Sequence, residues 1–258
     1  MSTREDIENG RLAYSCNCGW LDLGHLNPDS TRNYIGAINL WQQIKNESNI
    51  QYPACQFYPT HHGSVIPNRP CVLNDTMHMG KKTGLIGYKV TYLQDMRKWG
   101  IQVGRQRSYL VRKGLSDMQK KSVALAIFLE VSHLFESLQD SFPFNWITDS
   151  GYSQEDLVSN LIGFYIAIGE IDSIAQAKAL CHVLTKQQSL SLWDKHGPVG
   201  EHKNYTHQPQ FLPDTTYDNS MQSSDFCLNQ PKKFPEIFYR IKPANKGEYH
   251  RDLSFIEG

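Results

Sequence analysis

Apolar and polar positions alternate with a period of two in one part of this chain, which predicts extended structure. Between residues 87 and 94, tyrosine and valine alternate with lysine and threonine. Residues 100–112 repeat the pattern after a short gap. Two such runs joined by a short connection are typical of an antiparallel β-hairpin.

A helical period appears in several other stretches before about residue 190. Apolar residues recur three and four positions apart, and helix-capping residues precede several of these runs. Ser116 is the expected cap of the strongest helix, and Ser153 begins a sequence that resembles a capping box. The pattern predicts helices over residues 29–46, 117–139, 156–169 and 172–187.

Two long segments lack a regular pattern. Residues 51–84 and 197–258 are rich in proline, asparagine and histidine, with one strand-like run at 237–241. The second segment has too few apolar residues to form a core of its own, so we expect it to pack on the rest. The predicted fold is therefore α+β: a mostly helical single domain over residues 1–258, with a small antiparallel β-sheet and a long irregular C-terminal segment over residues 197–258.

Composition narrows the classes of partner. Lys plus Arg and Asp plus Glu balance at 26 each, so clustered positive charge for a nucleic-acid partner is not expected. No run approaches the ~20 apolar residues of a membrane span. The polar start, MSTREDIENG, predicts no signal peptide and a cytoplasmic protein by default, with six reduced cysteines. A secreted effector remains an alternative.

The helix over residues 117–139 places ionisable groups among apolar ones. It is apolar on nearly all sides, yet it carries Glu130, His133 and Glu136 at spacings of three, which puts neighbours on adjoining turns. Buried groups of this kind are paired or bind a metal. Two interpretations stay open: a helix edge that contacts water, and a functional site that uses Glu130 and His133.

The stretch CNCGWLDLGH, residues 16–25, is the second concentration of reactive side chains. Its C-x-C spacing does not match the C-x2-C of structural zinc sites. Asp22 and His25 lie between glycines just before a predicted helix, where a short loop can direct both toward Glu130 and His133. We therefore expect a site with His25, Glu130 and His133 as ligands of a divalent metal such as zinc, and Asp22 beside them.

The chain resembles a bacterial family of unknown function in three segments. The family's Cys-Gly-x-x-Asp-x-Gly-His element corresponds to CGWLDLGH, residues 18–25, and its Ser-x-Glu-Asp-Leu-x-Ser-Asn element to SQEDLVSN, residues 153–160. Its central helix carries a glutamate and a later His-Glu pair, but Phe135 stands here in place of that histidine. The resemblance implies that the three segments meet in space. Members of that family are often exported or lipid-anchored.

Three functions stay open from the sequence. The first is a hydrolase with a site of His25, Asp22, Glu130 and His133, with Asp156 as a further member, that acts on a small molecule or peptide with or without a metal.

The second is a thiol hydrolase or transferase with Cys18 as nucleophile, His25 or His133 as base, and Asp22 or Asn160 as the orienting group. The third is a non-enzymatic protein that binds a ligand or a protein partner through residues 51–80 and 197–258. Two loop clusters, at 60–62 and 77–79, contain the histidines and methionines that soft metals prefer.

Overall fold

A computed structural model describes most of the chain, and its described residues fall into two compact units. The described residues are 2–28, 35–47, 72–74, 84–98, 101–140, 153–199, 203–213, 215 and 225–253. The first unit comprises residues 1–29, 96–103 and 132–240, and the second comprises residues 30–95, 104–131 and 241–258. The prediction of a single domain stays a prediction.

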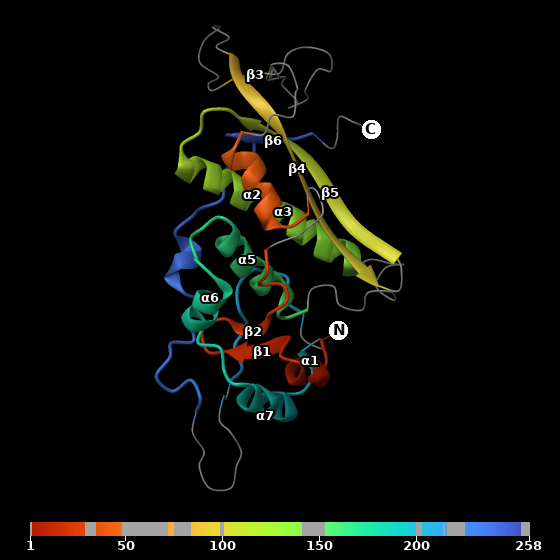
Figure 1. Cartoon of the computed structure of the whole chain (residues 1–258), viewed down its shortest axis with the longest axis vertical. Coiled ribbons are helices and arrows are strands. Elements are labelled where there is room, and N and C mark those ends of the chain that lie inside the picture. Colours follow the sequence, from red (N-terminus) through yellow and green to blue (C-terminus); the bar gives the residue numbers. More distant parts are fainter. Residues whose placement is uncertain are drawn as a thin grey trace. The chain divides into compact units, whose positions relative to one another are not determined.

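The first unit is organised around a two-stranded hairpin (Figure 1). Strands β1 (Leu12–Ser15) and β2 (Gly19–Asp22) pair antiparallel, and every residue in both is buried. The helices of this unit are α1 (Arg4–Glu8), α5 (Asp156–Ala167), α6 (Ile174–Leu180) and α7 (Lys186–His196). Both faces of the hairpin are therefore covered, so any group at the end of β2 is held on a fixed support.

Two disulfides fasten the turn of this hairpin. Cys16 is bonded to Cys227 and Cys18 to Cys181, and all four residues are buried. The expectation of reduced thiols is wrong for these four, because the fold brings the β1–β2 turn to the end of α6 and to the turn at Cys227. The other two cysteines, Cys55 and Cys71, lie outside the described residues.

An aromatic core lies beside these disulfides. The Tyr14 and Trp20 rings meet edge to face with centroids 5.3 Å apart, and Trp20 meets Trp193 of α7 in the same way at 5.9 Å. Such pairs add about 0.5–1.5 kcal/mol beyond the area they bury. The hairpin is thus fixed to α7 by packing as well as by covalent bonds.

The helix predicted over residues 172–187 is interrupted. α6 ends at Leu180, His182 has a φ of 51°, and α7 begins only at Lys186. Between the two helices the chain runs beside β1, where the Leu184 N–H donates to the Tyr14 carbonyl at 2.9 Å. The continuous helix was wrong because backbone pairing with β1 replaces helical hydrogen bonds there.

The segment after α7 packs aromatic residues against α5. The predicted strand at 237–241 is wrong: residues Glu236–Tyr239 form a 3-10 helix, η2. Phe238 of η2 stacks on Phe234 with centroids 4.3 Å apart, and the Tyr165 hydroxyl of α5 donates to the Phe238 carbonyl at 2.9 Å. The apolar run that resembles a strand in the sequence therefore forms a short helix that packs against Tyr165 of α5.

The second unit contains most of the larger sheet, whose strand order is β3-β4-β5-β6. The strands are β3 (Val72–Asn74), β4 (Gly84–Lys98), β5 (Ile101–Arg112) and β6 (His250–Asp252). β4 and β5 are the predicted hairpin. β6 was not expected from the sequence, and it pairs antiparallel with β5.

Two helices accompany this sheet. α2 (Ala37–Lys45) begins later than the predicted helix, of which residues 29–34 lie outside the description. α3 (Asp117–Asp140) begins in the second unit, as the capping sequence predicts, and continues into the first. Gln43 of α2 is hydrogen-bonded to the Thr91 backbone of β4 through both amide atoms. The α+β class with antiparallel sheets is therefore confirmed.

No helix in the described part of the chain is both long enough and apolar enough to span a membrane.

Candidate functional site

Asp22 and His25 lie on a tight turn at the end of β2. The Asp22 Oδ1 atom accepts the Gly24 N–H at 2.7 Å and the His25 N–H at 3.4 Å. An aspartate that accepts hydrogen bonds from backbone two and three residues ahead folds the chain back over its own carboxylate. The local sequence D-L-G-H therefore places the His25 imidazole above Asp22.

Helix α5 approaches this turn closely. The Ser159 Oγ atom accepts the Asp22 N–H at 2.9 Å. Gly163, one turn further, lies so close to the loop that a Cβ atom there would stand 2.7 Å from the His25 carbonyl oxygen. The CGWLDLGH and SQEDLVSN segments therefore meet in space, and α5 brings its first residue, Asp156, to the imidazole.

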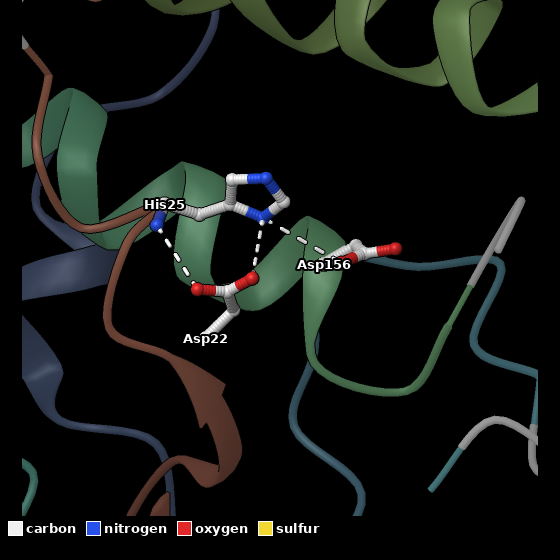
Figure 2. Close-up of side chains that lie close together, drawn as sticks. All are labelled: Asp22, His25 and Asp156. Atoms are coloured by element: carbon white, nitrogen blue, oxygen red, sulfur yellow. Dashed lines mark hydrogen bonds and ion pairs between the residues drawn. The ribbon is translucent and has the colours of Figure 1, made fainter. Parts of the chain in front are cut away.

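Asp22, His25 and Asp156 form one cluster (Figure 2). The His25 Nδ1 atom is 3.5 Å from Asp156 Oδ1 and 3.7 Å from Asp22 Oδ2. All three candidate ligand atoms lie within 4.8 Å of one another. The carboxylate side chains are only 5% and 11% exposed, whereas the His25 side chain is 42% exposed, so the cluster is open to solvent on the imidazole side.

Opposing effects set the protonation of the imidazole. Desolvation favours its neutral form, but the hydrogen bond with Asp156 and the charges of Asp156, Asp22 and Glu136 raise the pKa of His25 to about 9. In the absence of a metal the ring is therefore an imidazolium at neutral pH, held between two carboxylates.

The charge of Asp22 is also stabilised. Desolvation opposes ionisation, but His25 and Arg11 outweigh it, so the pKa of Asp22 is lowered from its ordinary value. Arg11 donates to Asp22 Oδ2 from Nε at 3.2 Å and from Nη2 at 3.0 Å. The arginine thus fixes the orientation of this carboxylate and keeps it ionised.

A third carboxyl group lies next in sequence to Asp156. Glu155 is 1% exposed and accepts a hydrogen bond from the Ser2 hydroxyl through Oε1. Burial, followed by the negative charge of Asp156, raises the pKa of Glu155 to about 7. The burial of Glu155 could not be predicted from the sequence, because its position beside an expected cap residue gives no sign of it.

The cluster has the donor set of a divalent metal site. Two carboxylates and one imidazole match the ligand types of zinc and of other first-row transition metals. Ligand bonds of about 2.0–2.2 Å at tetrahedral angles place ligand atoms about 3.3–3.6 Å apart. The observed separations from Nδ1, 3.5 and 3.7 Å, need only small side-chain rotations to reach that geometry.

The other residues expected at the site lie outside this cluster. Among the described residues, the group of metal-ligating atoms that lie together contains neither Glu130 nor His133. Glu130 lies in the second unit, where its carboxylate is 4.0 Å from the Lys246 amine. His133 is exposed on α3; burial, followed by the electrostatic influence of His133, lowers the pKa of His207 to about 4.

Cys18 is corrected. Its sulfur is bonded to Cys181 and the residue is 1% exposed, so it has no thiolate to act as a nucleophile in this structure. The loop clusters at 60–62 and 77–79 lie outside the described residues, as does most of the proposed binding segment 51–80.

Two residues that orient Asp22 were not predicted from the sequence. Arg11 stands in a polar stretch with nothing to mark it, and Ser159 has the orienting role that the sequence suggested for its neighbour Asn160. The signal for Ser159 was a hydroxyl within an apolar helix, because a buried polar group needs a partner.

In comparisons with known proteins, no family model, no curated protein and no solved structure matches this chain.

Proposed function

We propose that Asp22, His25 and Asp156 bind a divalent transition metal of the zinc class, and that this centre hydrolyses a small-molecule or peptide substrate. The single observation that carries the proposal is the convergence of His25 Nδ1 with a carboxylate oxygen of each aspartate, at 3.5 and 3.7 Å. Such a convergence is costly without a bound cation or a proton, since it concentrates negative charge.

Charge balance supports this assignment. Two ionised aspartates and a neutral imidazole neutralise a divalent cation, which takes the place of the proton that His25 otherwise carries. Asp22 Oδ2 also accepts from Arg11, and a carboxylate has lone-pair sites for both partners. Metal affinity is expected to rise with pH as the imidazolium loses its proton.

The open side of the cluster supports a catalytic role for the metal. Three protein ligands leave a coordination position for water or substrate, as in catalytic zinc sites. A metal bound there would lower the pKa of its water and supply a nucleophile at neutral pH. His25 and the two aspartates hold the ion, while Arg11 and Ser159 fix the position of Asp22.

The test is metal titration of protein stripped with a chelator, followed by isothermal calorimetry with zinc and manganese. We expect one ion per chain, and an affinity at least about 100-fold lower in Asp156→Asn and His25→Gln. Loss of a residue that only hydrogen-bonds to a metal ligand already lowers metal affinity by about 10–100-fold, so loss of a direct ligand should cost at least as much. Asp172→Asn, an exposed aspartate before α6, is the matched control and should bind as wild type. The proposal would be refuted if no stoichiometric metal binding is found, or if all variants bind the metal with equal affinity.

A second function is favoured by the orientation of the imidazole. Figure 2 shows that Nδ1 faces both carboxylates while the other ring nitrogen, Nε2, points away from them. A histidine held through Nδ1 can act as general acid or base through Nε2 without a metal. Assays on chromogenic esters, amides and phosphoesters separate the two: hydrolysis that survives chelators but is lost in His25→Gln supports acid–base catalysis.

The disulfides support a location different from the cytoplasmic default. Two buried disulfides that join residues 163 and 211 positions apart are typical of an oxidising compartment. We therefore propose that the protein works outside the reducing cytoplasm.

A further inference from the structure

A cavity lies in the first unit, at the outer edge of β1. Its volume is about 450 Å³, within the range of small-molecule sites. Its walls come from α1 and the turn that follows, from β1, from the end of α6 and from the linker to α7. No residue of the Asp22, His25 and Asp156 cluster lines it.

The lining is aliphatic with two positive charges. Apolar side chains form most of the wall, among them Ile7, Leu12 and Leu184, whereas the charged side chains are Lys178 and Lys186. None of the described residues that line the cavity carries a carboxylate. An apolar wall with only positive charge complements a molecule that has an apolar body and one anionic group.

Neither lysine has a carboxylate partner within the described ranges. The Lys186 amine donates to the Glu8 carbonyl oxygen at 3.2 Å, which leaves two of its three N–H donors for a ligand. Lys186 is also the first residue of α7, an eleven-residue helix whose N-terminal end carries partial positive charge. In the described part of the chain, neither lysine at this cavity is therefore paired with a carboxylate.

We propose that this cavity binds a small amphipathic carboxylate, a medium-chain fatty acid or a molecule of the same shape and charge. The aliphatic chain lies against Ile7, Leu12 and Leu184, and the carboxylate accepts hydrogen bonds from Lys178 and Lys186. The site is separate from the metal cluster and does not depend on the function proposed for it.

The experiment is calorimetric titration of the full chain with sodium decanoate below its micellar concentration, with decanol as the uncharged probe. We expect saturable binding of one decanoate per chain and at least about ten-fold weaker binding of decanol, because two partly screened charge pairs are lost. Lys178→Gln combined with Lys186→Gln should lower decanoate affinity by about the same factor. Lys195→Gln, an exposed lysine in the last turn of α7, is the control and should leave affinity unchanged.

A second variant tests the cavity itself. Ala179 is exposed on α6 at the cavity wall, so Ala179→Trp fills the space without removing a charge or a buried side chain. We expect this variant to retain its circular dichroism spectrum and lose decanoate binding. No saturable binding to wild type, equal binding of decanol, or undiminished binding to both the double-lysine and the tryptophan variant would overturn the proposal.

Discussion

Substitution of Gly163 by alanine is expected to destabilise the protein, although the same change in a helix interior ordinarily does the opposite. Alanine is favoured over glycine in a helix by about 1 kcal/mol. At this position, however, the new Cβ would stand 2.7 Å from the His25 carbonyl oxygen and 3.3 Å from that of Leu26. Both obstacles are backbone atoms, so the loop itself must retreat by several tenths of an ångström.

The magnitude follows from these two opposing effects. Overpacking costs about 1–3 kcal/mol, and this contact falls toward the upper end because no flexible side chain can move aside. After the gain in helix propensity, we expect a net loss of about 1–2 kcal/mol in the free energy of unfolding. The retreat also moves His25 away from Asp156, and because a ligand set must be held to about 0.5 Å, metal affinity should fall by about ten-fold.

Urea unfolding and zinc calorimetry on the same preparations measure both effects. Asn160→Ala on the same helix is the matched control: it gains helix propensity but adds no atom against the loop, so it should not lose stability. If Gly163→Ala is as stable as wild type and binds zinc equally well, the close packing of α5 on the turn at Asp22 is refuted.

Three further results are expected. In metal-free protein, NMR titration should give His25 a pKa of about 9; Asp156→Asn should lower it. Because the folded pKa is raised, this imidazolium stabilises the fold fully below about pH 6.5, and the melting temperature of the metal-free protein should fall as the pH rises through 9. A melting temperature that rises over this pH range would contradict the prediction. Peptide mapping without reductant should recover Cys18 linked to Cys181, and its reduction should cost about 2–5 kcal/mol by denaturant unfolding; free thiols at both positions would contradict this. Ser159→Ala leaves a buried N–H unpaired and should cost about 1–3 kcal/mol, whereas wild-type stability would show that bond to be dispensable.

The elements with the strongest periodicity were predictable from the sequence. β4, β5, α3 and α5 all occur where the pattern places them, because each buries a face whose period is set by local geometry. The predicted helix over residues 172–187 is interrupted at Cys181, which forms a disulfide with Cys18, 163 positions earlier. A contact over such a separation has no local signature.

The site was predictable in part for the same reason. Asp22 and His25 could be paired in advance because one turn holds both. Asp156 was expected mainly as a helix cap, whereas in the structure the N-cap of α5 is Glu155, which makes no side-chain capping hydrogen bond. Its partner in space, His25, is 131 positions earlier, so only tertiary packing of α5 on β2 reveals the cluster.

Similar reasoning explains Glu130. Its position in an apolar helix indicated a partner, and Lys246 is one. Lys246 lies in the C-terminal segment, whose irregular sequence does not predict which of its residues lies beside α3.

The most direct test of the metal centre is a crystal structure of the protein grown with zinc, with anomalous scattering recorded on both sides of the zinc edge. We expect one anomalous peak about 2.0–2.2 Å from Nδ1 of His25 and from one carboxylate oxygen of each of Asp22 and Asp156. A zinc-saturated crystal with no peak between these three residues, and with the Nδ1 of His25 still held by the two carboxylates alone, would contradict the account.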